Sequence, residues 1–184
     1  QLTAVQKERD DLLKQVEYMK SQGVSDGGIA DEQLKLRAGL TNVKGKGVSV
    51  TIEDSSAPIQ SGENPNLYII HDEDILRVVN ELRAGGAEAI AINDQRLIGT
   101  SEIRCSGPTI TVNGKVFGAP FIVTAIGDPD TLNSALTLRG GVVDSLKHWG
   151  IKVTVKKEQS VAVPAFTGTF KSDYLQPNEQ GGKG

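Results

Sequence analysis

The spacing of the hydrophobic residues changes along the chain, and this change constrains the fold more than any other feature. In residues 1–22 the apolar residues recur at intervals of three and four, which is typical of an α-helix. From Lys46 onward Val48, Val50 and Ile52 alternate with polar residues, which is typical of a half-buried strand. The chain therefore predicts an N-terminal helix followed by a domain that contains a β-sheet.

The N-terminal pattern fits a heptad repeat in which one core position is charged. Three heptads make a marginal helix on their own, so the segment needs partners or a longer helix to be stable. We interpret residues 1–22 as a coiled-coil stalk that forms a homodimer, with the arginine helping to set the register. The alternative is an amphipathic helix that packs on its own domain. The candidate oligomerisation residues are Leu2, Val5, Arg9, Leu12, Val16 and Met19.

Glycine and serine residues follow the stalk and predict a flexible linker over residues 23–30. The globular domain is expected to span residues 31–171 and to begin with a short helix capped by Asp31. Residues 172–184 are rich in polar residues and glycine and are expected to form a disordered tail.

The globular domain is predicted to be α+β. Its elements read as β-α-β, an inserted hairpin, and a second β-α-β, which favours a ferredoxin-like β-α-β-β-α-β arrangement with both helices on one face of a mostly antiparallel sheet. Whether the last helix is broken at Gly140-Gly141 or only bent is left open. The expected strands cover 48–52, 87–93, 95–104, 121–126 and 151–155, with helices over 72–84 and from 128, and a hairpin turn at Asn113-Gly114.

Composition excludes several classes of function. The 20 basic and 23 acidic residues give a net charge of -3, which argues against nucleic acid as the main partner. One cysteine excludes an internal disulfide and a thiolate zinc cage. No apolar run is long enough to span a membrane.

No catalytic, metal-binding or cofactor-binding motif emerges from the remaining candidates. Lys44-Gly45-Lys46-Gly47 lacks the spacing of a phosphate loop and reads as a turn that leads into a strand. His71 precedes three acidic residues that suit the start of a helix. His148 suits the last turn of a helix, and Cys105 is expected to be a small hydrophobic residue of a strand. We therefore expect a protein that is not an enzyme and needs no cofactor or metal.

One polar cluster, Asn93-Asp94-Gln95-Arg96, lies between two apolar segments. Arg96, with Arg104 further along, has the chemistry to hold a carboxylate or phosphate in a forked contact. The alternative is a turn in which Asn93 and Asp94 adopt positive φ and Arg96 pairs with a nearby acid. A binding role for Asn93, Asp94, Gln95, Arg96 and Arg104 is thus a hypothesis.

The chain resembles the bacterial domain-of-unknown-function 881 family over roughly residues 31–175. Related sequences often have proline before the double glycine, where this chain has Arg139. The matching stretches are Leu82–Ile90, Ile92–Arg96, Ile103–Ile110, Val112–Gly114, Gly140–Asp144 and Val163–Ala165.

The resemblance implies a protein of the cell membrane with this domain on the extracytoplasmic side. Members of the family typically carry one N-terminal transmembrane helix and a short coiled coil, so the anchor is expected upstream of Gln1. Some are labelled division initiation proteins, and their genes often lie near cell-division and cell-wall genes. We therefore expect an interaction or assembly protein whose partners are membrane-associated division or wall-synthesis proteins. The alternative is a small-ligand-binding or regulatory domain that uses the Asn93–Arg96 turn.

Overall fold

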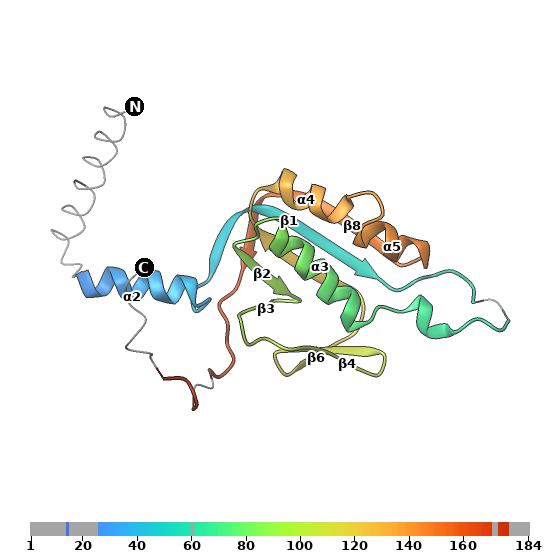
Figure 1. Cartoon of the computed structure of the whole chain (residues 1–184), viewed down its shortest axis with the longest axis horizontal. Helices are drawn as coiled ribbons and strands as arrows, with labels where there is room; N and C mark the ends of the chain where they lie inside the picture. Colours follow the sequence, from blue (N-terminus) through green and yellow to red (C-terminus); the bar gives the residue numbers. More distant parts are fainter. Residues whose placement is uncertain (1–13, 15–25, 60, 171–172, 177–184) are drawn as a thin grey trace.

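The computed structural model describes residues 14, 26–59, 61–170 and 173–176 (Figure 1). This part of the chain is α+β and contains two antiparallel sheets together with helices. The predicted coiled-coil residues Leu2, Val5, Arg9, Leu12, Val16 and Met19 lie outside the described residues, so the dimer stays a prediction.

The larger sheet has five strands, and all of its neighbouring strands are antiparallel. The second β-α-β unit interleaves with the first, because β7 lies between β2 and β1 and β1 lies between β7 and β8. This order leaves β3 and β8 at the edges of the sheet. In spatial order the strands are β3 (Gln95–Arg96), β2 (Ala89–Ile92), β7 (Phe121–Ile126), β1 (Val43–Glu53) and β8 (Lys152–Val163).

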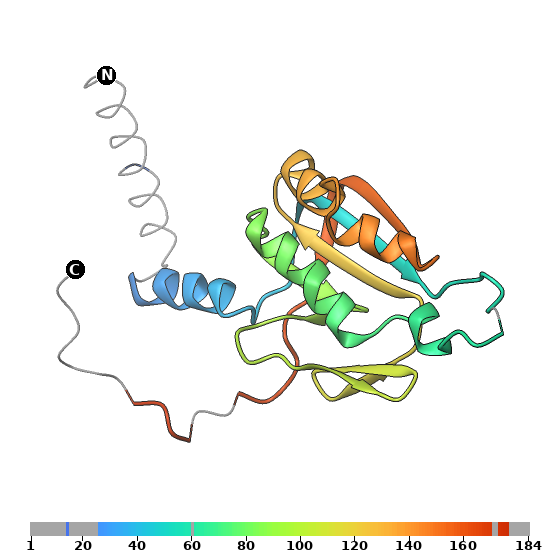
Figure 2. The ribbon, with the colours of Figure 1, turned by 45° about the vertical axis from the view of Figure 1, so that its right-hand side comes forward.

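The helices α3 (Asp72–Ala84), α4 (Pro129–Thr137) and α5 (Val142–His148) cover one face of this sheet (Figure 2). The predicted alternation in β1 is confirmed, because Val48, Val50 and Ile52 are fully buried beneath the helices. The buried helical side chains recur at helical spacing. They are Ile75, Val78, Val79, Leu82, Leu132, Leu136, Val142, Val143 and Leu146.

Local sequence explains where these helices start and stop. The Asp128 side chain caps α4 by accepting a hydrogen bond from the Thr131 amide at 3.0 Å, and Pro129 suits the first turn. The helical region that begins there is broken at Gly140-Gly141 and resumes as α5, which answers the question left open by the sequence. Helix α3 begins at Asp72 as expected, and His71 is its N-cap.

The inserted segment forms a sheet of its own, made of β4 (Ile103–Ser106), β5 (Thr109–Val112) and β6 (Lys115–Phe117). The predicted turn between β5 and β6 is confirmed, with φ of 50° at Asn113 and 75° at Gly114. The single strand expected over 95–104, with a bulge or bend at Gly99, is wrong. The chain leaves the larger sheet after Arg96 and enters the smaller one at Ile103, so one strand could not serve both.

The segment before β1 differs from the expectation. Helix α2 spans Asp26–Arg37, so residues 26–30 of the predicted flexible linker are helical and Asp31 is not the helix cap. Strand β1 starts at Val43, which places the glycine-rich Lys44–Gly47 inside a strand and not in a turn. The register with β8 shifts between Gly45 and Gly47, so the glycines lie at an irregularity in the sheet.

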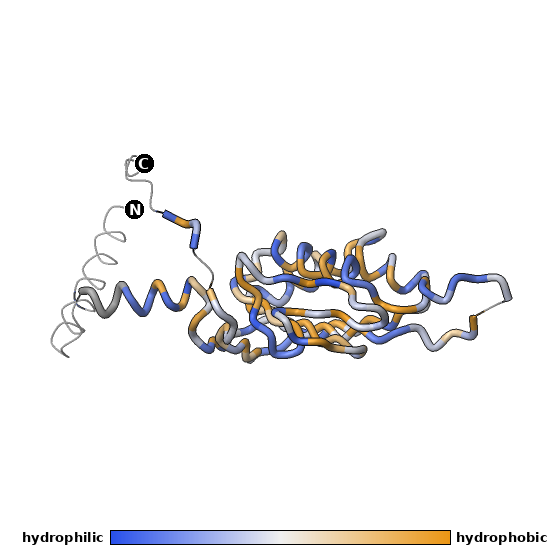
Figure 3. Tube along the Cα trace, turned by 90° about the horizontal axis from the view of Figure 1, so that it is seen from below, coloured by the Kyte–Doolittle hydropathy of each residue, from blue (hydrophilic) through white to orange (hydrophobic). Residues whose placement is uncertain are grey.

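The long loop after β1 projects from the domain and is mostly hydrophilic, apart from a few apolar residues (Figure 3). It contains the short 3-10 helix η1 (Pro65–Tyr68), and the Asn64 side chain caps this helix by accepting from the Asn66 amide at 3.1 Å. The last strand also departs from the prediction, because β8 continues to Val163, well beyond Val155.

Candidate functional site

The residues between β2 and β3 form a tight turn that is tied to the adjacent β7. Asn93 and Asp94 have φ of 43° and 62°, so the predicted left-handed turn is confirmed. The Asn93 side-chain oxygen accepts a hydrogen bond from the Ile122 amide at 2.7 Å, and the Asn93 amide donates to the Ile122 carbonyl at 2.9 Å. Asn93 therefore has a structural role, while the Asp94 side chain is exposed.

Arg96 is the most unusual residue of this region, because it is a charged side chain with only 6% of its surface exposed. Its Nη1 donates to the carbonyl oxygens of Pro164 and Thr41, at 3.3 and 3.5 Å. The guanidinium thereby holds the segments that precede β1 and follow β8 against β3. The alternative in which Arg96 pairs with an acid is wrong, since within the described residues it forms no ion pair with a carboxylate.

In the described part of the chain, two cavities border Arg96. The larger, of about 310 Å³, is also lined by Arg37 from the end of α2, Arg83 from the last turn of α3, and Glu88. The smaller, of about 240 Å³, shares Glu88 and Arg96 and adds Lys44. Four basic side chains and one acidic side chain therefore border the two cavities. Burial lowers the pKa of the Arg96 guanidinium from its ordinary value.

The structure brings together only part of the set predicted from the sequence. Gln95 is 8% exposed and lies beside Arg96 in β3, opposite Ile92 of β2. Arg104 lies exposed in β4 of the other sheet and lines neither cavity next to Arg96. Sequence reasoning missed Arg37 and Arg83, because their only local signal was a basic residue near the end of a helix.

A second polar cluster joins the start of α3 to β4. The Asp72 amide donates to Cys105 Sγ at 3.1 Å, the Cys105 amide donates to Asp72 Oδ2 at 2.8 Å, and His71 Nδ1 lies 3.8 Å from Sγ. Cys105 lies in strand β4 as expected, but it is exposed and hydrogen-bonded, so the expectation that it is simply a small hydrophobic residue is wrong.

This cluster does not activate the cysteine. Partial burial of the sulfur against α3, together with the negative charges of Asp72 and Asp74, raises the pKa of the Cys105 thiol. The amide of Cys105 in turn lowers the pKa of Asp72, because it donates to the ionised carboxylate. The contacts thus stabilise a charged aspartate and a neutral thiol, which suits a structural link between α3 and β4.

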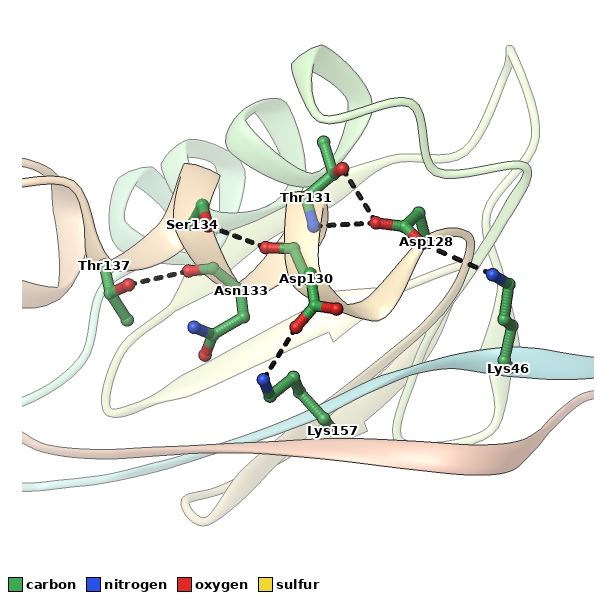
Figure 4. Close-up of polar contacts among 8 residues, drawn as sticks. All are labelled: Lys46, Asp128, Asp130, Thr131, Asn133, Ser134, Thr137 and Lys157. Atoms are coloured by element: carbon green, nitrogen blue, oxygen red, sulfur yellow. Dashed lines mark hydrogen bonds and ion pairs between the residues drawn. The ribbon is translucent and has the colours of Figure 1, made fainter.

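The acidic residues at the start of α4 also make structural contacts (Figure 4). Asp128 accepts from Lys46 of β1 at 3.3 Å, and Asp130 accepts from Lys157 of β8 at 2.7 Å. Both pairs are exposed, so they contribute little to stability individually. Hydrogen bonds from the backbone and hydroxyl of Thr131 lower the pKa of Asp128, and Lys46 adds to this effect.

Across residues 26–59 and the described residues after them, no group of three or more metal-ligating side chains comes together. The same search range contains no helix long and apolar enough to cross a membrane.

Comparison with models of protein families shows which family the chain belongs to. The model of a family described as a bacterial protein of unknown function, DUF881, matches residues 31–176. The chain belongs to this family. The DUF881 match starts within α2 and ends beyond β8, so it includes the Arg96 cavities and both sheets.

Relatives of this DUF881 domain include two proteins with UPF0749 names. The Bacillus subtilis UPF0749 protein YlxW is 48% identical over 130 residues, which cover 71% of this chain and 56% of that protein. The Mycobacterium tuberculosis UPF0749 protein Rv1825 is 33% identical over 178 residues, covering 91% of this chain and 57% of that protein. The chain thus spans just over half the length of these relatives.

A solved structure described as an uncharacterized conserved protein from Mycobacterium tuberculosis is similar to the domain. It superposes with a TM-score of 0.64 at 33% identity, covering 79% of this chain and 96% of that chain. The match therefore extends over nearly the whole of that structure.

Proposed function

We propose that the chain is a non-enzymatic, membrane-tethered interaction protein of the bacterial division or envelope machinery, with its DUF881 domain on the extracytoplasmic side. An anchor N-terminal to Gln1 would hold it at the membrane, and residues 1–22 would form the dimeric coil. The family resemblance and the heptad pattern support this proposal.

The main structural support for an interaction role is that strand β8 lies at an edge of the larger sheet. It is 12 residues long, and among the described residues it pairs only with β1. An unpaired edge presents backbone groups to which an extended segment of a partner can add as a further strand. The register shift beside Gly45 leaves the regular part of this edge at Lys152–Glu158.

The side chains of β8 favour selective binding over uncontrolled aggregation. Lysines at sheet edges discourage unwanted strand pairing, and β8 carries Lys152, Lys156 and Lys157. Two of them form ion pairs, Lys152 with Glu53 at 2.8 Å and Lys157 with Asp130. Lys156 is exposed and forms no ion pair with another described residue, so its side chain is available to a partner that binds along β8.

We also propose that the domain is ferredoxin-like. The order β2-β7-β1-β8, with α3 connecting β1 to β2 and α4 and α5 connecting β7 to β8, supports this assignment. Strand β3 and the smaller sheet would then be an insertion between the second and third strands of the motif.

The proposal is tested by crosslinking in intact cells with the membrane-anchored protein. A photoreactive amino acid replaces Lys156 on β8, and in a matched control it replaces Asn80, which is exposed on α3. We expect division or wall-synthesis proteins to be captured from position 156 and not from position 80. A third protein that lacks residues 1–22 but keeps the anchor should capture less, because the coil would supply dimeric binding.

Equal capture from both positions would refute binding at β8. Recovery of only the protein itself from position 156 would refute the assembly role as proposed.

A further inference from the structure

Among the described residues Arg96 forms no ion pair with an acidic side chain, although Glu88 lines the same two cavities. Only 6% of the surface of Arg96 is exposed. Its described hydrogen-bond partners are the neutral carbonyl groups of Thr41 and Pro164. Although burial lowers its pKa, a guanidinium stays protonated at neutral pH. A buried charge is costly unless it is paired, so this position favours an anion that the protein itself does not supply.

The unused part of the guanidinium has the geometry of an anion-binding fork. Nη1 is occupied by the two carbonyls, whereas Nε and Nη2 make no hydrogen bond to a described residue. Every fully buried side-chain nitrogen or oxygen in the described structure has a partner, so Nε and Nη2 are not fully buried, and Arg96 lines both cavities. These two N–H groups point the same way and match two oxygens of a carboxylate or phosphate.

The surroundings of the fork add positive charge. Arg37 and Arg83 are exposed and line the larger cavity together with Arg96, and Glu88 is the acid of that lining. Arg37 and Arg83 also complement the negative ends of α2 and α3, so their presence alone would not indicate a ligand. Arg96 lies in a strand and has no such explanation. The volume of about 310 Å³ lies at the lower end of the range for small-ligand sites.

We propose that this cavity binds an oxyanion, the carboxylate or phosphate group of a small molecule or a lipid headgroup. The Nε–Nη2 fork of Arg96 anchors the anion, and Arg37 and Arg83 approach it from the cavity wall. The site lies beside β3, at the opposite edge of the sheet from β8. Strand addition at β8 and anion binding at Arg96 can therefore fail separately.

Nuclear magnetic resonance of the intact chain tests the site through the Arg96 Nε–H signal. The probes are inorganic phosphate, acetate, and small vesicles of phosphatidylglycerol with phosphatidylcholine vesicles as the neutral control. Chloride keeps the ionic strength constant. We expect a saturable shift with phosphate or acetate if the ligand is soluble, and with phosphatidylglycerol alone if it is a headgroup.

Two variants and a control connect the binding to the cavity. Arg96→Gln should weaken the binding of the effective probe, followed by backbone amide shifts around β3, by roughly 10- to 100-fold, because charged hydrogen bonds are lost. Arg104→Gln removes an exposed arginine of the other sheet and should leave binding unchanged.

The double variant Arg37→Gln/Arg83→Gln changes only exposed side chains, so it tests the site even if Arg96→Gln unfolds. It should weaken binding roughly two- to fivefold. The absence of a saturable shift with all three anionic probes would overturn the proposal. Binding that is equal in wild type and the double variant and also survives in a folded Arg96→Gln would overturn it too.

Discussion

Replacing Gly47 with alanine should disrupt the centre of the larger sheet. A Cβ atom at this position would lie 1.9 Å from the carbonyl oxygen of Ala125 and 3.0 Å from Cα of Ile126. Both contacts are with the backbone of β7, so no side-chain rotation can relieve them. Because ordinary van der Waals contact begins near 3.4 Å, relieving the 1.9 Å contact with the Ala125 oxygen requires the two strands to separate by about 1.5 Å.

The cost follows from the hydrogen bonds and packing that this separation removes. Strands lie about 4.8 Å apart, so an opening of about 1.5 Å breaks the adjacent ladder bonds between β1 and β7. Two such bonds at about 1 kcal/mol each, with about 1 kcal/mol of lost packing, give a decrease of about 3 kcal/mol in the free energy of unfolding. For a domain of this size, the melting temperature should fall by roughly 6–12 °C.

Urea denaturation followed by circular dichroism measures this change. The matched control is Gly118→Ala, where an added Cβ meets no atom within 4 Å and the free energy of unfolding should change by no more than about 0.5 kcal/mol. If Gly47→Ala unfolds at the same urea concentration as the wild type, the close approach of β1 and β7 at this position is wrong.

Three further predictions concern the core, the start of α4 and the cysteine. Leu132→Ala should lower the free energy of unfolding by about 2–5 kcal/mol in urea titration, because Leu132 is fully buried and packs beside Gly127; a cost under about 1 kcal/mol would contradict that burial. The pKa of Asp128 is lower in the folded state than its ordinary value of 3.8. The ionised carboxylate therefore stabilises the fold at pH values above 3.8, and this stabilisation is lost as the pH falls through the lower pKa of the folded state. Thermal melting of the wild type and Asp128→Asn should therefore differ at pH 7 and converge in strong acid, whereas a constant difference would exclude this linkage. Cys105 should react with iodoacetamide at pH 7 more slowly than in urea-unfolded protein, because its pKa is raised in the fold, and equal rates would contradict the raised pKa.

Local patterns in the sequence predicted the elements that local chemistry determines. The alternation around Val50 predicted β1, the Asn113-Gly114 pair predicted a hairpin turn, and the positive φ of Asn93 and Asp94 followed from their residue types. These features depend on residues close together in the chain, so a single sequence is sufficient to recognise them.

Other elements depended on pairing between distant segments. The second half of β8 is polar around Lys157 and Ser160 and lacks an alternating pattern, yet it is a strand because it pairs with the start of β1. Helix α2 extended into a region whose glycines predicted a linker. Residues 95–104 divided between two sheets, because Arg96 pairs with β2 of the larger sheet whereas Ile103 pairs with β5 of the smaller one.

The sequence by itself determined the α+β class, the family and the turn that carries Arg96. Only the tertiary structure decided that Arg96 is buried with backbone carbonyls as its described partners, and that Arg37 and Arg83 line the same cavity. The physical reason is that the burial of a side chain, and the charged groups that surround it, depend on how distant parts of the chain pack together. Arg37 and Arg83 lie on helices separated in the chain by β1 and the long loop, so no local pattern indicates that they meet.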